Sequence, residues 1–121
     1  MIVRVIVGAL AATSWILACP AWAQDVEMGK QTFAACAPCH ASDQNGIGPK
    51  LGGVLNRPAA SVEGFRYSRA MKNSKVVWDE KSLDAYLNEP QTFVPGNLMP
   101  FSGISDAQKR SDLIAYLGTL K

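Results

Sequence analysis

The chain has 121 residues, of which 12 are Lys or Arg and 10 are Asp or Glu, so its formal net charge is only +2 at pH 7. This length suits a single small domain, and a charge so close to zero excludes a protein that binds nucleic acid through a broadly basic surface. It also excludes a strongly cationic protein that a large overall field steers towards its partners.

The first 23 residues have the three-part pattern of a secretory signal peptide. Arg4 supplies a positive charge, residues 5–18 form an apolar stretch without a charge, and Ala21-Trp22-Ala23 is a small-x-small cleavage site. We expect cleavage after Ala23 and export to the periplasm, which leaves residues 24–121 as the mature domain.

Two alternatives remain for this N-terminal region. The apolar stretch is short for a transmembrane helix, so we expect no stable membrane insertion, but an uncleaved anchor is an alternative. Ile16-Leu17-Ala18-Cys19 resembles a lipoprotein processing box, so lipid anchoring at Cys19 is a second alternative. Pro20 directly after Cys19 is unfavourable for such processing.

Residues 26–36 are predicted to form the first helix of the mature domain. Asp25 is a good N-cap, and Val26, Gly29 and Phe33 fall on one helical face. A glycine inside a helix is costly unless another element packs closely against it. The helix would present the residues that follow it at its C-terminal end.

Residues 36–40 are Cys-Ala-Pro-Cys-His, the attachment motif of a c-type haem. The thiols of Cys36 and Cys39 can form thioethers with the two vinyl groups of the porphyrin, and His40 can ligate the iron. A thioredoxin-like pair would need a strand-and-helix context, and a structural zinc site would need four ligands. His40 is the only histidine, so we expect one haem c per chain, bound through Cys36 and Cys39.

The rest of the chain is predicted to contain helices and long irregular segments, with no convincing strand. Residues 41–64 are rich in Gly and Pro, and a loop this long is best explained if it wraps an edge of the haem. Within it, we expect the carbonyl of Pro49 to accept a hydrogen bond from the second nitrogen of His40, with simple stiffening of the loop as the alternative role of this proline.

Three further helices are expected, which makes the fold class all-α. The first covers residues 68–74, and the second is capped by Asp79 and ends before Pro90. Residues 90–104 are predicted to be irregular. Ser105-Asp106-Ala107-Gln108 resembles a capping box that begins the last helix, whose apolar face continues to Leu120.

The second axial ligand has to come from a residue other than histidine. Met28 lies just before the haem motif on the same helix, so it cannot easily reach the opposite face of the ring. Met71 is better explained by core packing. Met99 lies in the irregular Pro95-Gly96-Asn97-Leu98-Met99-Pro100 segment, so we predict that Met99 is the ligand.

With these motifs in place, residues 24–121 resemble a class I cytochrome c, of the mitochondrial-like branch that includes bacterial cytochromes of the c-two type. The order and spacing of several motifs carry the resemblance. They are Gly29 and Phe33 before the haem motif, then Gly48-Pro49, residues 64–68, Trp78, and residues 83–87, 95–99 and 110–117.

The resemblance implies a fold of helices and long loops around one covalently attached haem. His40 and Met99 would be the axial ligands. The other implied contacts are Arg57, Tyr67 and Trp78 around the inner propionate, and Asn73 and Tyr86 in a polar network on the methionine side.

The resemblance also implies a function: a soluble monomeric carrier of single electrons that cycles between Fe(II) and Fe(III) and is not an enzyme. Its partners would be a quinol-oxidising complex on one side and an oxidase, a dehydrogenase or a photosynthetic reaction centre on the other. A haem enzyme or gas-binding protein is the alternative, and it would need an open sixth iron position.

Overall fold

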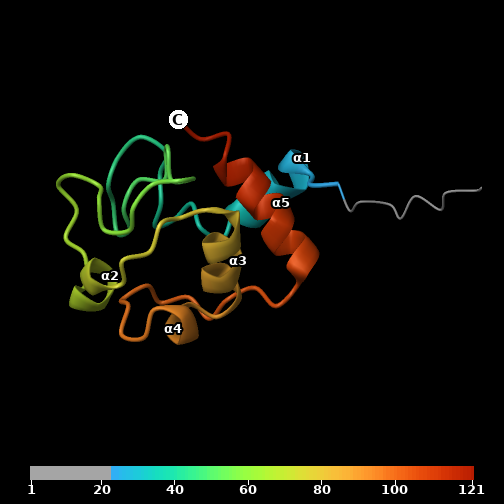
Figure 1. Ribbon diagram of the computed structural model, residues 1–121. Coiled ribbons are helices and arrows are strands. Elements are labelled where there is room, and N and C mark those ends of the chain that lie inside the picture. Colours follow the sequence, from blue (N-terminus) through green and yellow to red (C-terminus); the bar gives the residue numbers. More distant parts are fainter. Residues whose placement is uncertain (1–22) are drawn as a thin grey trace, which may run out of the picture.

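The computed structural model describes residues 23–121, so the predicted signal peptide lies outside the described residues apart from Ala23, and Cys19 lies outside them as well. Within residues 23–121 there are helices and one isolated β-bridge, between Pro58 and Val77, which confirms the all-α class (Figure 1). The helices are α1 (Val26–Phe33), α2 (Arg69–Asn73), α3 (Glu80–Asn88), α4 (Pro90–Phe93) and α5 (Ala107–Leu117).

The two terminal helices, α1 and α5, cross and pack against each other (Figure 1). A Cβ atom on Gly29 would lie 2.0 Å from the carbonyl oxygen of Asp112, so only glycine allows this approach. One turn further on, the rings of Phe33 and Tyr116 lie 5.2 Å apart between their centroids. The close approach of α5 therefore explains a glycine at this position inside a helix.

The end of α1 differs from the prediction. The helix stops at Phe33 rather than at Cys36, because the N–H groups of Ala34, Ala35 and Cys36 bond to carbonyls three residues back instead of four. Bonds four residues back return within the haem motif, where the N–H of Ala37 bonds to the carbonyl of Phe33 and the N–H of His40 to the carbonyl of Cys36, both at 3.0 Å.

The middle helices begin close to the predicted positions. Asp79 caps α3 as predicted, and Ser68, predicted as the first residue of its helix, is the N-cap of α2. Each accepts a hydrogen bond from the backbone N–H three residues on. The exposed carboxylate of Asp79 has its pKa lowered by its bonds with the backbone N–H and hydroxyl of Ser82. Both caps use local hydrogen bonds that the sequence alone specifies.

Two details of the C-terminal half were predicted wrongly. Residues 90–93 form the single-turn helix α4, which Pro90 can begin because the first N–H of a helix needs no partner within the helix. The N-cap of α5 is Asp106, not Ser105: its carboxylate accepts from the N–H groups of Gln108 and Lys109 at 2.9 and 3.0 Å.

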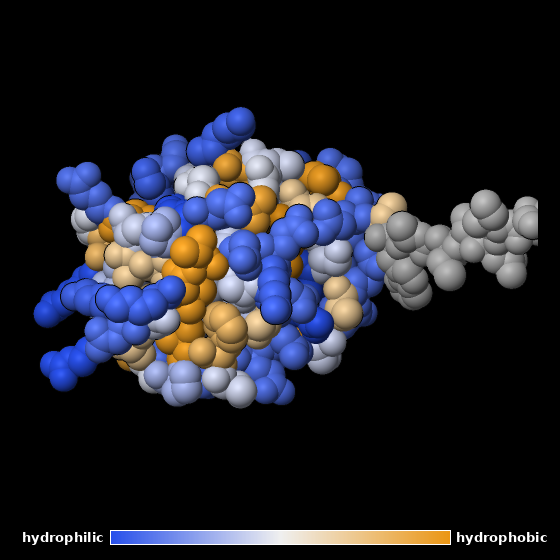
Figure 2. All heavy atoms as spheres, in the orientation of Figure 1, coloured by the Kyte–Doolittle hydropathy of each residue, from blue (hydrophilic) through white to orange (hydrophobic). Residues whose placement is uncertain are grey.

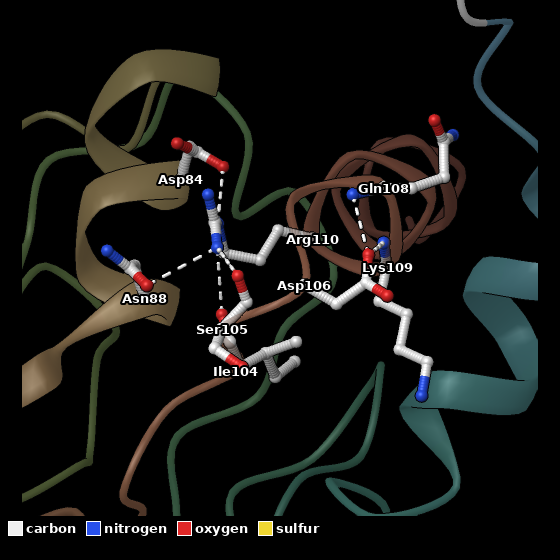
Figure 3. Close-up of polar contacts among 8 residues, drawn as sticks. All are labelled: Asp84, Asn88, Ile104, Ser105, Asp106, Gln108, Lys109 and Arg110. Carbon is white, nitrogen blue, oxygen red and sulfur yellow. Dashed lines mark hydrogen bonds and ion pairs between the residues drawn. The ribbon is translucent and has the colours of Figure 1, made fainter.

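A buried arginine ties α5 to α3 and to the segment between them (Figure 3). The guanidinium of Arg110 donates to Asp84 at 2.7 Å, to the carbonyls of Ile104 and Ser105 at 2.9 Å each, and to Asn88 at 3.3 Å. Its Nε and Nη1 groups thus have polar partners, as a buried cation requires. The bond from Arg110 to the carbonyl of Ser105 also holds Ser105 outside α5.

Candidate haem-binding site

Two cavities of about 120 and 310 Å³ lie between the haem motif and the segment of Met99. They adjoin, because seven residues line both: Cys36, His40, Pro49, Tyr67, Met71, Met99 and Phe101. The volume of the larger one falls in the range of about 300–1,000 Å³ that is usual for cofactor sites. The smaller cavity extends into the apolar core. Protein cores are normally close-packed, so a cavity at this place is unusual.

His40 forms one wall of both cavities in a fixed orientation. Its Nδ1 lies 2.8 Å from the carbonyl oxygen of Pro49, as the sequence predicted. A carbonyl can only accept, so Nδ1 carries the proton and Nε2 keeps its lone pair for ligation. Gly48 lies directly against the ring: a Cβ atom there would be 2.4 Å from Cε1 of His40.

The two thiols of the motif lie beside this histidine. Cys36 lines both cavities and Cys39 lines the larger one. Both cysteines are free and half-buried. Burial raises the pKa of the Cys36 thiol, and the neighbouring Cys39 raises it further. Two thiols next to a fixed imidazole are the set of groups that the attachment and ligation of a haem c need.

Met99 lies at the wall of both cavities on a segment distant in sequence from the motif. The hydroxyl of Tyr86 donates towards its sulfur at 3.8 Å, and Asn97 Oδ1 lies 3.5 Å from the same hydroxyl. Burial raises the pKa of Tyr86 to about 12, so the phenol remains a neutral donor at physiological pH. Met71 also lines both cavities.

Asn97 is a site residue that the sequence analysis missed. Its side chain is only 5% exposed and donates to the carbonyls of Pro90 and Val94, both at 2.9 Å. Its Oδ1 accepts the backbone N–H of Met99 at 3.0 Å. The signal in the sequence was a polar residue two positions before a methionine, in a loop that contains Pro and Gly. This residue can form its hydrogen bonds only once the loop has closed.

A polar group lines the smaller cavity. Arg57 donates to the backbone carbonyls of Lys50 and Gly52, at 3.1 and 3.0 Å, and within residues 23–121 it has no carboxylate partner. Burial lowers its pKa, with an opposing contribution from Tyr67. The hydroxyl of Tyr67 accepts the N–H of Val62 at 3.1 Å, so its own proton remains available. Together, Arg57 and Tyr67 suit an anionic substituent of a bound group.

Trp78, also predicted here, is buried in the cavity wall with its ring centroid 4.9 Å from that of Tyr86. Asn73 is different: it lies exposed on α2 and lines neither cavity. The structure thus brings nine of the ten predicted residues to the two cavities and leaves Asn73 outside. These nine are Cys36, Cys39, His40, Pro49, Arg57, Tyr67, Trp78, Tyr86 and Met99.

The arrangement fits a haem c on chemical grounds. Two thiols and an imidazole with a free lone pair lie on one side, a thioether lies on another segment, and the walls are mainly apolar and aromatic. The uncompensated guanidinium of Arg57 matches the negative charge of a haem propionate.

Comparison with known proteins agrees with this chemistry. The family model described as Cytochrome c matches residues 26–121. Cytochrome c2 of Blastochloris viridis is 44% identical over 101 residues, which cover 81% of this chain and 80% of that protein. Cytochrome c of Euglena viridis is 44% identical over 100 residues, covering 80% of this chain and 98% of that protein.

A solved structure gives the same result. Cytochrome cH from Methylobacterium extorquens superposes with a TM-score of 0.77 at 43% identity, and the match covers 78% of this chain and 98% of that one. The chain therefore belongs to the cytochrome c family, whose members carry a covalently bound haem c and act as one-electron carriers rather than enzymes.

Proposed function

We propose that this protein is a soluble, monomeric, periplasmic carrier that moves single electrons between redox complexes, with His40 and Met99 as the axial ligands of its haem iron. The observation that supports this most directly is that both side chains line the same two cavities from segments far apart in the sequence. Occupied on both sides, the iron has no open position for a substrate.

Haem c, when bound, supplies the Fe(III)/Fe(II) couple. The protein holds both candidate ligands in place by its own hydrogen bonds. Pro49 fixes the ring of His40, and Asn97 fixes the backbone at Met99. Ligands held in this way need little rearrangement when the charge changes. The apolar walls exclude water and favour the state of lower charge.

The predicted partners follow from family membership and export. A quinol-oxidising complex would donate electrons, and an oxidase, a dehydrogenase or a photosynthetic reaction centre would accept or exchange them. The periplasmic location depends on cleavage after Ala23. Over residues 23–121, no helix combines the length and the hydropathy that crossing a membrane requires.

The identity of the second ligand is tested by two methionine variants of the exported holoprotein. Met99 and Met71 both line the cavities, so Met71→Ala is the matched control. We expect Met99→Ala to keep the attached haem, to lose the weak far-red methionine-to-iron band of the oxidised protein, and to bind carbon monoxide when reduced.

Met71→Ala should retain the far-red band and exclude carbon monoxide, as the unmodified protein should. If instead Met71→Ala loses the band and Met99→Ala keeps it, the assignment of Met99 is wrong. If the unmodified protein itself binds carbon monoxide readily, the site is open and the proposal of a simple electron carrier fails.

A further inference from the structure

The loop between α4 and Met99 has few buried side chains to hold it in place. Of residues 95–98, only Asn97 is buried, and the other three are exposed. Gly96 has a φ of +85°, in the left-handed region that glycine enters at little cost. A short, exposed segment of this kind opens easily unless hydrogen bonds hold it, so the bonds at Gly96 and Asn97 bear directly on the position of Met99.

The side chain of Gln91, on α4, makes two hydrogen bonds to this loop. Its Nε2 donates to the carbonyl of Asn97 at 2.8 Å, and its Oε1 accepts the N–H of Gly96 at 3.3 Å. A carbonyl can only accept and a backbone N–H can only donate, so the two partners fix the orientation of the amide. One exposed side chain thus holds two consecutive residues of the loop.

Asn97 makes the opposite connection, from the loop to the helix. Its side chain donates to the carbonyls of Pro90 and Val94, at the two ends of α4, and its Oδ1 accepts the N–H of Met99. The carbonyl that Gln91 holds therefore belongs to the residue whose side chain bonds to the backbone of Met99. Gln91 thus acts on Met99 through Asn97.

The helix that carries Gln91 is itself firmly placed. The side chain of Pro90, its first residue, is fully buried. The ring of Phe93, its last residue, lies 6.4 Å between centroids from that of Tyr86 on α3, whose hydroxyl donates towards the sulfur of Met99. Because α4 is anchored in this way, the two bonds of Gln91 hold the loop instead of moving with it.

Gln91 acts from the surface of the molecule. It lines neither of the two cavities of the haem site. In Figure 1, α4 and the loop after it lie at the lower edge of the molecule, beneath α3, and Figure 2 shows pale and hydrophilic atoms along that edge. An effect of this side chain on an iron ligand therefore has to pass through the loop.

We propose that Gln91 is a positioning residue that keeps the thioether of Met99 at the iron and so keeps the sixth position closed to small ligands. The inference rests on the proposed assignment of Met99 as an axial ligand. Without the two bonds of Gln91, the loop moves away from the site more often, and the sixth position is open during that time. A closed position is what distinguishes an electron carrier from a haem protein that binds small molecules.

Imidazole tests this on the oxidised holoprotein, because this small nitrogen ligand can bind the iron only after Met99 has left it. The rate at which the far-red methionine band disappears in excess imidazole measures how often the loop opens. Gln91→Leu keeps a side chain of similar size without polar atoms. It should lose the band about fivefold faster, as expected for the loss of about one net hydrogen bond. Equal rates in Gln91→Leu and the unmodified protein would overturn the role of Gln91.

Gln91→Glu separates the two bonds. A carboxylate can still accept the N–H of Gly96, but it cannot donate to the carbonyl of Asn97, and it places a negative charge against that oxygen. We expect this variant to lose the band at least as fast as Gln91→Leu. A rate equal to that of the unmodified protein would show that the bond to Asn97 holds nothing in place, and the proposal would be wrong.

Two controls distinguish positioning from a general loss of stability. Thr92→Val changes the neighbouring exposed residue of α4 and should keep the rate of the unmodified protein. Asp106→Ala removes the cap of α5, whose bonds lie within that helix, and so lowers the free energy of unfolding without altering the loop. It too should keep the unmodified rate. If Asp106→Ala loses the band as fast as Gln91→Leu, imidazole enters through overall unfolding and Gln91 has no positioning role.

The spectrum before imidazole is added separates this inference from the proposed function. If the unmodified oxidised protein lacks the far-red band, Met99 is not the ligand, and the proposed function fails together with the role of Gln91. If the unmodified protein and the variants all show the band at the start, a rate that does not respond to Gln91→Leu overturns the positioning role alone.

Discussion

Asn97 and Tyr86 connect the proposed distal ligand to the surrounding protein at the scale of single residues. Asn97 bonds to the carbonyls of Pro90 and Val94 and to the N–H of Met99 at once. Both carbonyls also accept a backbone N–H, so removing the amide leaves only the N–H of Met99 without a partner, a loss of about 1–3 kcal/mol. The side chain of Asn97 thus fixes the backbone of Met99, and the hydroxyl of Tyr86 donates towards the sulfur of Met99.

Tyr86 also makes the free energy of unfolding depend on pH in the alkaline range. Burial raises the pKa of its phenol from about 10 to about 12, so the folded state holds this proton more tightly than the unfolded state. The contribution of the neutral, buried phenol to the free energy of unfolding is therefore complete below pH 10. It is lost as the pH rises from about 10 through 12. A shift of this size corresponds to about 3 kcal/mol.

Tyr86→Phe removes this titration. We expect the free energy of unfolding of the unmodified holoprotein to fall by about 2 kcal/mol more than that of Tyr86→Phe between pH 9 and pH 12. Denaturant unfolding of both proteins across this range measures the difference. Parallel curves would show that burial does not keep the phenol neutral in the folded protein.

At the scale of elements, the sequence predicts what local hydrogen bonds decide. The caps at Ser68 and Asp79 need only residues three positions away, so the starts of α2 and α3 were predicted to within one residue. The end of α1 at Phe33 depends on whether the next N–H groups bond three or four residues back, which the helical pattern does not specify. For α5, Ser105 and Asp106 are neighbouring residues that can both cap a helix, so the local pattern did not decide between them.

The candidate site shows the same division. The haem motif predicted Cys36, Cys39 and His40 because their spacing is itself the signal. Asn97 was missed because its partners meet only when the loop after α4 closes. Asn73 was assigned to a polar network by resemblance alone, and α2 places it on the outside.

The crossing of α1 and α5 depends on one missing side chain. In Gly29→Ala, the added methyl group would meet the backbone of Asp112, which cannot move without displacing α5. We expect a loss of about 3 kcal/mol or more in the free energy of unfolding, at the upper end for overpacking. Thermal or denaturant unfolding of the holoprotein measures this loss.

Gly46→Ala is the matched control for this substitution. Its added methyl group would lie 3.5 Å from the carbonyl oxygen of Cys39, an ordinary van der Waals distance. The control should unfold within about 1 kcal/mol of the unmodified protein. Similar losses in both variants would mean that glycine flexibility, and not the helix crossing, explains the effect.

At the scale of the whole molecule, the core is built around the haem site. Of the nine buried residues in the hydrophobic cluster, seven also line the smaller cavity. They are Val54, Trp78, Leu83, Tyr86, Leu87, Leu113 and Leu117. A domain of this length has little apolar area to spare, so a core that faces an unfilled cavity gives too little stabilisation to offset the loss of chain entropy.

Folding should therefore depend on attachment of the haem. Cys36→Ala combined with Cys39→Ala removes both thioethers, and we expect the haem-free product to lack the helical circular dichroism and the cooperative thermal transition of the holoprotein. Ala34→Ser combined with Ala37→Ser changes two exposed residues beside the thiols and should retain both properties. A haem-free double-cysteine variant with native helix content and cooperative unfolding would show that the side chains around the cavity pack well enough without the group they surround.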